Sequence, residues 1–166
     1  NYWTQRLMTE DSPKSQQILR VLRMKALMAY KSKETYAKAL FDNIPDKCIL
    51  FANTQEQADK LCSYSYHSTN PDSKKNLELF KEGTIKQLSC VMQLSEGVNI
   101  PELRQSIIMH AYGNERKASQ RIGRLMRLSP NDISLVHVLC YSGTVDELWV
   151  KQALAGYGSS SITWNI

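Results

Sequence analysis

A short, unbroken apolar run from Cys48 to Ala52 constrains the fold of this chain more than any other stretch. Five apolar residues in a row are typical of a strand that is buried on both faces, as in a parallel sheet covered by helices. Thr54 and Gln57 then form the pattern of a capping box, which predicts that a helix begins directly after the strand and continues through Leu61. The run therefore predicts the first strand and helix of an alternating architecture.

The remainder of the chain repeats this alternation. Further short strands are expected at residues 64–67, 88–92, 106–110 and 133–140, and helices at 70–83, at 120–127 and from 144 to 153. Strands separated by helices at this rhythm predict an α/β fold in three layers, a mostly parallel sheet with helices on both faces. Open parallel sheets bind ligands beyond the carboxyl ends of their strands. A site is therefore expected on the loops after Ala52, His67, Met92 and His110.

The N-terminal part is predicted to be helical. Ser12 is expected to cap a helix whose first position is Pro13, and a second helical stretch is expected to end before Pro45. Residues 1–12 are expected to form an entry strand or a linker. In domain terms, we predict a helical lead-in at 1–46 that packs on the same domain, a main domain at 47–154 and a C-terminal tail at 155–166.

The composition is that of a globular protein. The 166 residues are 42% hydrophobic and 22% charged, with a formal net charge of +5, a modest excess that is compatible with binding nucleic acid or nucleotide. The four cysteines contain no Cys-x-x-Cys pair and are interpreted as reduced thiols, and no apolar run approaches the roughly 18 residues of a membrane span. We therefore expect a cytoplasmic protein with no membrane partner. Because the chain begins with Asn, we expect it to be a piece of a longer protein.

The stretch from Gln120 to Arg127 reads Gln-Arg-Ile-Gly-Arg-Leu-Met-Arg and is predicted to form a short helix. Gln120, Arg124 and Arg127 then lie at i, i+4 and i+7 on one face. Gly123 costs about 1 kcal/mol relative to Ala inside a helix, which indicates a role in close approach or packing. A doubly cationic face beside bare backbone suits a bound phosphate. The alternative is a solvated face, which is the more common use of arginines at helical spacing.

The loop from Gln93 to Pro101 carries a second set of candidates. Gly97 lets the backbone approach a ligand closely, and Asn99 offers both a donor and an acceptor, as a ribose hydroxyl requires. The alternative is a plain turn closed by Pro101, which the loop taken alone favours.

The order and separation of three stretches, Cys48 to Thr54, Glu96 to Pro101 and Gln120 to Arg127, resemble motifs IV, V and VI of the C-terminal motor domain of superfamily-two helicases. The resemblance runs from about Lys47 to about Ala153. It implies the second of two RecA-like domains, with ATP in the cleft between them. The pattern around the second stretch is similar to DNA motors of phage, repair and restriction systems more than to the RNA-dedicated DEAD-box group.

The resemblance also implies roles for individual residues. Arg127 would be the arginine finger, with Arg124 as its partner at the terminal phosphates, and Gln120 would contact the γ-phosphate or the attacking water. Glu96, Gly97 and Asn99 would lie at the nucleotide, the last two near the ribose. Family members often carry Asp where this chain has Asn99, and Thr in the strand where this chain reads Ser-Cys-Val-Met.

Two elements of an ATP site are missing from the sequence. No Gly-Lys dipeptide occurs, so the chain has no phosphate-binding P-loop. Asp146-Glu147-Leu148-Trp149 imitates the acidic box that holds magnesium, but Thr144 and Glu147 predict the capped start of a helix instead. We therefore expect ATP and Mg²⁺ to be bound mainly by an upstream RecA-like domain of the same protein, and we expect no ATP hydrolysis by this chain alone.

The resemblance implies nucleic-acid contacts from the loops after the first two strands, namely Asn53, Thr54, Ser68 and Thr69. Each of these is otherwise a cap or turn residue. The partner is expected to be DNA, with RNA as the alternative. The three histidines, His67, His110 and His137, share no metal-binding spacing, and the latter two are expected to be satisfied core groups.

Three hypotheses of function follow. The first is the second motor domain of an ATP-dependent helicase or translocase. The second is a nucleic-acid-binding or regulatory module that keeps the fold without a motor, and the third is an interaction scaffold.

Overall fold

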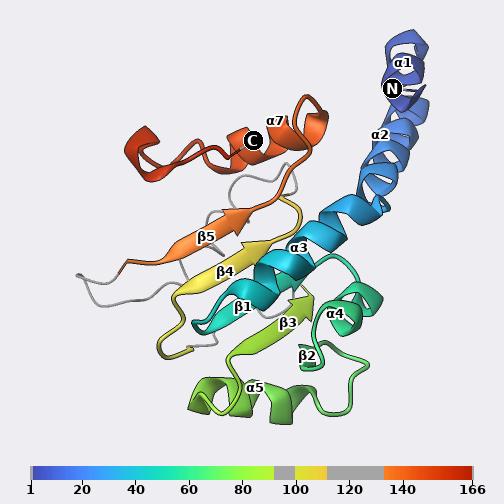
Figure 1. Cartoon of the computed structure of the whole chain (residues 1–166). Helices are drawn as coiled ribbons and strands as arrows, with labels where there is room; N and C mark the ends of the chain where they lie inside the picture. The colour runs from blue at the N-terminus through green and yellow to red at the C-terminus, as the bar shows by residue number, and fades with distance from the viewer. Residues whose placement is uncertain (1, 92–99, 112–132, 166) are drawn as a thin grey trace. The chain divides into compact units, whose positions relative to one another are not determined.

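The computed structural model describes residues 2–91, 100–111 and 133–165 (Figure 1). The chain divides into two compact units, Asn1–Ser32 and Lys33–Ile166, which we call the N-terminal unit and the sheet unit. The predicted helix at 120–127 and most of the predicted loop at 93–101 lie outside the described residues. The predicted domain boundaries stay a prediction.

The N-terminal unit contains two helices that pack against each other, α1 (Tyr2–Thr9) and α2 (Pro13–Met28). The expectation of a strand or linker at 1–12 was wrong, because residues 2–9 are helical. The ring of Trp3 meets that of Tyr2 edge to face, with 5.0 Å between ring centroids. α2 begins as predicted, with Pro13 in its first turn after Ser12, although the Ser12 side chain makes no capping hydrogen bond.

The sheet unit contains a five-stranded, entirely parallel sheet in the order β2-β3-β1-β4-β5. This confirms the predicted fold class. β1 lies at the centre and pairs with both β3 and β4, and all five of its residues are buried, as the apolar run predicted. The strands are β1 (Cys48–Ala52), β2 (Ser65–Tyr66), β3 (Gln87–Val91), β4 (Gln105–Ile108) and β5 (Leu135–Val138).

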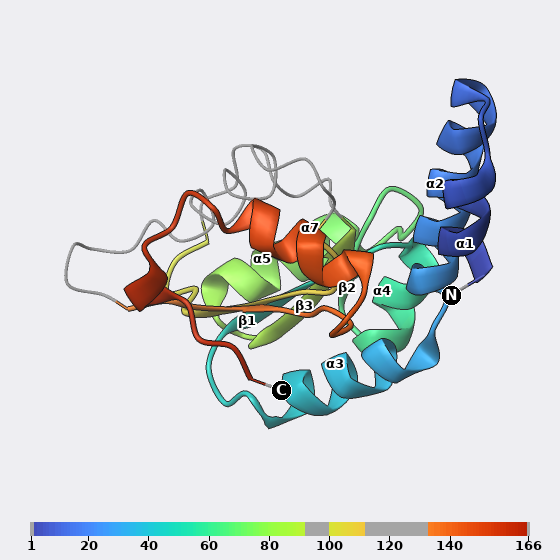
Figure 2. The same cartoon turned by 90° about the horizontal axis from the view of Figure 1, so that it is seen from above.

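Helices cover both faces of this sheet (Figure 2). One face packs against α3 (Lys31–Asn43) and α4 (Gln55–Leu61), and the other packs against α5 (Ser73–Glu82) and the segment around α7 (Val145–Ala153). Alternate residues of β1 point to the two faces, as the twofold period of a strand requires. Cys48, Leu50 and Ala52 join the α3–α4 core, whereas Ile49 and Phe51 join the α5 core.

Capping residues fix where α4 and α7 begin. Thr54 Oγ1 accepts a hydrogen bond from the Gln57 backbone N–H at 3.1 Å, and Thr144 Oγ1 accepts one from Asp146 N–H at 3.1 Å. In both cases the Gln or Glu side chain of the predicted capping box bonds the backbone N–H of the residue before the cap, and not that of the cap itself. Gln57 Oε1 accepts from Asn53 N–H and Glu147 Oε2 from Gly143 N–H. The predicted starts of α4 and α7 are therefore confirmed, whereas α5 begins at Ser73 and not at residue 70.

The end of α5 shows why the chain needs a glycine there. Gly83 adopts a φ of +82°, in the left-handed region where a side chain is strained, and it closes the helix as the sequence predicted. All four cysteines are free thiols. Among the described helices, none is long and apolar enough to cross a membrane.

Candidate functional site

Polar side chains gather at the carboxyl edge of the sheet, beyond the ends of the strands, in two groups. The first lies around β2, the loop after it and the facing side of α4, and we call it the His67 cluster; it comprises Gln55, Asp59, Ser65, His67, Ser68 and Thr69. The second lies beyond β4 and β5, and we call it the Lys33 cluster; it comprises Lys33, His110, Tyr141 and Asp146.

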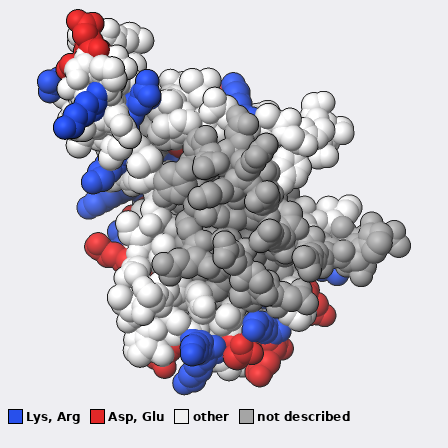
Figure 3. Space-filling view, turned by 180° about the vertical axis from the view of Figure 1, so that it is seen from behind, with Lys and Arg blue, Asp and Glu red and all other residues white. Residues whose placement is uncertain are grey.

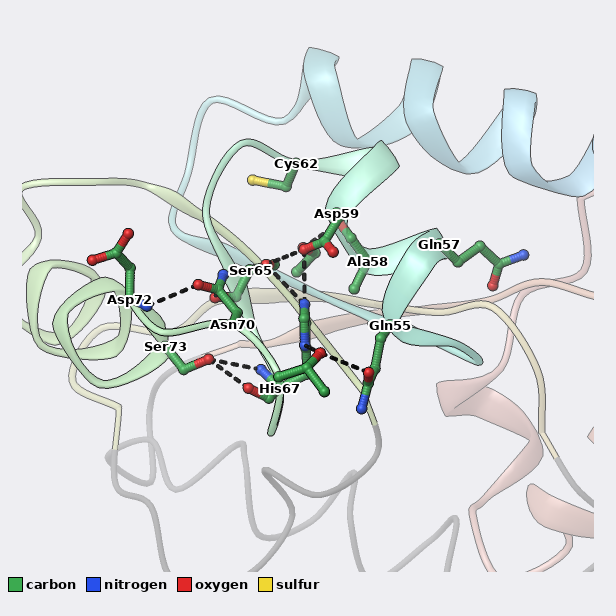
Figure 4. A network of polar contacts seen from close by, with 12 residues as sticks. Gln55, Gln57, Ala58, Asp59, Cys62, Ser65, His67, Asn70, Asp72 and Ser73 are labelled. Carbon is green, nitrogen blue, oxygen red and sulfur yellow. Dashed lines mark hydrogen bonds and ion pairs between the residues drawn. The ribbon is translucent and has the colours of Figure 1, made fainter.

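In the His67 cluster, a buried imidazole links α4 to the loop after β2 (Figure 4). His67 Nε2 lies 2.8 Å from Asp59 Oδ1 on α4, and Nδ1 lies 3.1 Å from Thr69 Oγ1 in the loop. The backbone of His67 is held as well, because Ser73 Oγ donates to its carbonyl at 2.6 Å and accepts from its N–H at 3.1 Å. The ring therefore fixes the conformation of the residues that follow it.

Gln55 joins this loop to the start of α4, directly after β1. Its Oε1 accepts a hydrogen bond from Thr69 Oγ1 at 2.7 Å, and its Nε2 donates to Ser68 Oγ at 3.0 Å. The sequence-predicted residues Thr54, Ser68 and Thr69 are thereby brought to one place. Asn53 lies beside them, half-buried, with its N–H bonded to Gln57.

The directions of these hydrogen bonds separate the hydroxyls into two kinds. Thr69 donates its only hydroxyl proton to Gln55. Thr54 and Ser68 instead accept, from Gln57 N–H and Gln55 Nε2, so each keeps its own O–H donor for another partner. Both residues are exposed. The site can therefore present two hydroxyl donors to an anionic ligand.

Asp59 gives this cluster its charge. Hydrogen bonds from His67 and then from Ser65 hold the pKa of the Asp59 carboxyl below its usual value. The carboxylate side chain is 55% exposed, whereas the His67 side chain is only 3% exposed. The negative charge therefore lies at the solvent side of the cluster and orients the imidazole from outside.

The Lys33 cluster is built around a buried ion pair. The Lys33 ammonium, from α3, contacts the Asp146 carboxylate at the start of α7, and their side chains are only 4% and 1% exposed. Lys33 Nζ also donates to the carbonyl of Leu139 at 3.1 Å and reaches His110 Nδ1 at 3.2 Å. Its three protons thus have three acceptors, while Asp146 Oδ2 also accepts from Tyr141 N–H at 3.0 Å.

This arrangement fixes the protonation of His110. Because an ammonium can only donate, His110 Nδ1 must accept, and the ring proton lies on Nε2. Burial, and then the neighbouring Lys33 charge, lower the pKa of His110 to about 3. Nε2 is buried and has no hydrogen-bond partner within the part of the chain that the structure describes. His110 is buried as expected, but only one of its two ring nitrogens is hydrogen-bonded there.

Sequence reasoning interpreted Asp146 correctly as part of a helix start rather than as an acidic box, since it lies in the first turn of α7. It missed the buried Lys33, whose partner is 113 residues away. The only local signal was position: Lys33, Ala37 and Phe41 follow one another at i, i+4 and i+8 on the buried side of α3.

A hollow of about 530 Å³ lies at the opposite, amino edge of the sheet, between the end of α3 and the start of β3. Residues of the loops before β1, β2 and β3 line it, among them Pro45, Tyr64 and Lys86. It contains none of the residues of the two clusters. Across residues 2–91, 100–111 and 133–165, no group of His, Cys, Asp and Glu side chains is arranged to hold a metal ion.

Comparison with known proteins identifies the family of this chain. A sequence model of the helicase conserved C-terminal domain matches residues 31–129, more than half of the chain. The chain belongs to this family. The match includes α3 and the His67 cluster and ends before α7. The resemblance predicted from three short motifs is thereby confirmed.

Relatives of this helicase C-terminal domain include a DNA translocase and an RNA helicase. It is 24% identical over 107 residues to the DNA 3'-5' translocase XPB2 of Sulfurisphaera tokodaii, covering 61% of this chain and 24% of that protein. It is 30% identical over 121 residues to the pre-mRNA-processing ATP-dependent RNA helicase PRP5 of Kluyveromyces lactis, covering 66% of this chain and 14% of that protein. The chain thus spans a quarter or less of each relative's length.

A solved structure supports the same fold for this helicase C-terminal domain. The C-terminal domain of the DEAD-box protein Dbp5 superposes with a TM-score of 0.61 at 15% identity, over 81% of this chain and 82% of that one. At this identity the similarity concerns the fold alone.

Proposed function

We propose that this chain is the second motor domain of an ATP-dependent nucleic-acid helicase or translocase. The observation that carries the proposal is the family match over residues 31–129, which spans an edge where two hydroxyl donors are held ready for an anion. In an open parallel sheet this edge is where ligands bind.

For the nucleic-acid track, we assign the loops after β1 and β2. Thr54 and Ser68 donate hydrogen bonds to phosphate oxygens, Thr69 positions Ser68 through Gln55, and the half-buried Asn53 contributes from the residue directly after β1. Contacts of this kind fix a strand in register without reading its sequence. They suit a protein that moves along nucleic acid, because every nucleotide offers the same phosphate.

For the ATP side, the proposed roles rest on the sequence, since the residues lie outside the described part of the chain. Arg127 acts as arginine finger, Arg124 assists it at the terminal phosphates, and Gln120 contacts the γ-phosphate or the attacking water. Glu96, Gly97 and Asn99 are assigned to the nucleotide, with the last two near the ribose. An always-ionised guanidinium is suited to charge that spreads over the terminal oxygens during phosphoryl transfer.

ATP and Mg²⁺ are assigned to an upstream RecA-like domain of the same protein. This chain has no Gly-Lys dipeptide for a P-loop, and its described carboxylates form no metal-binding group. Closure of the two domains brings Arg127 to the terminal phosphate, and reopening releases it. Alternation between these states moves the Thr54 and Ser68 loops relative to the upstream half of the track.

The Arg127→Ala substitution in the full-length protein tests this function. Nucleic-acid-stimulated ATP turnover is expected to fall by about 10³ to 10⁵, the factor that an arginine finger contributes, while nucleotide binding changes far less. Arg104→Ala, an exposed arginine at the amino end of β4, is the matched control and should leave turnover unchanged. Unchanged turnover in Arg127→Ala would contradict the proposal. Nucleic-acid binding without any turnover in the full-length wild type would favour the non-motor module.

DNA is the proposed partner, and a direct comparison tests it. DNA and RNA oligonucleotides of the same sequence are titrated into the full-length protein, and both affinity and stimulation of turnover are measured. We expect DNA to give the greater stimulation. Equal or greater stimulation by RNA would assign the motor to RNA.

A further inference from the structure

The N-terminal unit lies almost wholly outside the family match, which begins at residue 31. The family therefore does not account for it. It is a pair of packed helices with a large excess of positive charge. Residues 1–32 contain six Lys and Arg against two acidic residues, Glu10 and Asp11, so this unit carries +4 of the formal +5 of the chain. Residues 33–166 contain fifteen basic and fourteen acidic residues and carry only +1.

The excess is concentrated on α2, which has four cations and no acidic residue: Lys14, Arg20, Arg23 and Lys25. Figure 3 shows basic side chains gathered on these N-terminal helices. Within the described part of the chain, none of the four forms an ion pair. Among the described lysines of the sheet unit, five do form one: Lys33, Lys38, Lys60, Lys81 and Lys151. The α2 cations are therefore not neutralised by neighbouring carboxylates.

Two of these cations also disfavour each other. Arg20 and Arg23 lie at i and i+3, where like charges on a helix repel each other. Burial, and then the Arg20 charge, lower the pKa of Arg23. The Nε of Arg23 is buried and has no hydrogen-bond partner among the described residues. The two arginines repel each other, and Arg23 lacks a hydrogen-bond partner at Nε within the part of the chain that the structure describes. A bound anion would relieve both effects, so this helix is suited to binding one.

We propose that α2 binds the phosphate backbone of nucleic acid as a contact separate from the loops of the sheet unit. A polyanion complements a helix with four unpaired cations and no acidic residue, and such contacts supply affinity that does not depend on sequence. The inference rests on the proposed nucleic-acid function. The competing occupant is a protein, since Ile18, Val21 and Leu22 are also exposed on α2. We favour nucleic acid over a protein as the partner because the four cations of α2, unpaired within the described residues, suit a polyanion, and an apolar protein contact does not require them.

The test is a salt titration of binding to a fluorescein-labelled single-stranded DNA oligonucleotide, measured by anisotropy with the 166-residue chain. In the Arg20→Glu/Lys25→Glu variant, both substituted residues are exposed. Its affinity should fall at least about tenfold at 50 mM salt. The slope of log K against log salt should become shallower by about 1.4, the release expected for two lost phosphate contacts on a single strand.

The matched control is Lys81→Glu/Lys86→Glu, which changes the net charge equally at the amino edge of the sheet. It should leave the slope unchanged. An equal loss in both variants would mean that net charge alone governs binding, and would overturn the proposal. So would an unchanged slope in the α2 variant, or a loss of helical circular dichroism in that variant alone.

Two further outcomes separate this proposal from the function on which it rests. If Ser68→Ala weakens binding and the α2 variant does not, the track stands and the α2 proposal is wrong. If the wild-type chain binds no nucleic acid at all, both are wrong for this chain. Should the α2 variant instead dissociate a self-associated form in sedimentation with DNA binding unchanged, the helix contacts protein and the proposal is again wrong.

Discussion

The two clusters at the carboxyl edge use similar residues, each with a histidine, an aspartate and hydrogen-bonding partners from distant segments, but they direct their hydrogen bonds differently. In the Lys33 cluster every proton of the ammonium meets an internal acceptor, and the charges are sealed from water. In the His67 cluster the chain of bonds ends at the exposed hydroxyl of Ser68, which keeps its own donor, and the neighbouring Thr54 hydroxyl keeps its donor as well. A sealed network stabilises the domain, whereas an open one is available to a ligand. The predictions below test this difference.

Breaking the buried ion pair should have the largest effect. Asp146→Ala leaves the Lys33 charge buried without a counterion, and should lower the free energy of unfolding by about 3–5 kcal/mol. Urea unfolding of the 166-residue chain measures it. Asp42→Ala is the control, since its partner Lys38 is exposed and such pairs contribute about 0.2–1 kcal/mol.

A double variant sharpens the interpretation. Lys33→Met/Asp146→Leu removes both charges and should recover much of the lost stability, because neither group is then left buried and unpaired. If Asp146→Ala costs no more than Asp42→Ala, the Lys33 cluster is not sealed and the contrast with the His67 cluster is wrong.

The second prediction concerns pH. His110 has a pKa of about 3 in the folded chain, against about 6.5 for an unperturbed histidine. Between these values the unfolded chain binds a proton that the folded chain does not, so stability falls as the pH drops below about 6.5. The slope attributable to His110 reaches about 1.4 kcal/mol per pH unit.

The His110→Gln variant isolates this contribution in urea unfolding between pH 7 and pH 5. Its unfolding free energy should vary less steeply with pH than that of the wild type. His137, whose pKa burial also lowers, is present in both proteins and cancels in the difference. Identical slopes would show that His110 titrates normally and is not enclosed by its cluster.

A pair of helix caps compares the clusters directly. Thr54→Ala and Thr144→Ala each remove a capping hydrogen bond, from α4 and α7 respectively, and each should cost about 1 kcal/mol of stability. Only Thr54→Ala should also weaken binding to single-stranded DNA, because only Thr54 belongs to the open edge. Equal weakening by both variants would remove the functional distinction between the two regions.

The smallest effect is expected at Ser68. Ser68→Ala removes one proposed phosphate donor and should weaken DNA binding by about 0.5–1.5 kcal/mol, roughly two- to tenfold, with stability unchanged. Ser68→Thr keeps the hydroxyl and should bind like the wild type. Ser63→Ala, an exposed serine at the amino edge, is the control. A loss of stability in Ser68→Ala would indicate a structural rather than a binding role.

Much of the sheet unit could be predicted from the sequence because its signals are local. The apolar run of β1, the caps at Thr54 and Thr144, and the glycine that ends α5 each depend on residues a few positions apart. The bounds of β1 were predicted correctly, β3 and β4 begin one residue earlier than predicted, and β2 and β5 are shorter than predicted at both ends. β5, for example, spans Leu135–Val138 rather than 133–140, because apolar residues continue past the last ladder hydrogen bonds.

Most of the parts that were missed in the sheet unit depend on contacts distant in sequence. α1 was missed for a different reason, since its apolar residues span only eight positions, and it packs on α2, which begins a few residues later. A lysine on a helix is usually solvated, and no residue near Lys33 in the sequence indicates that it pairs with Asp146 in the interior. The order of hydrogen bonds around His67 likewise follows only from the fold, since it requires α4 and the loop after β2 to meet.

Under the proposed function, the Gln55 bridge has a mechanical consequence. A strand pulled through the domain exerts its load on whichever groups hold the phosphate, and a single loop would bend under that load. Because Gln55 ties Ser68 and Thr69 to the base of α4, and His67 ties the same loop to Asp59, tension at one hydroxyl is shared by two elements rooted in the sheet. We therefore expect Gln55 to matter less for how tightly the domain binds at rest than for the opposing force at which it slips.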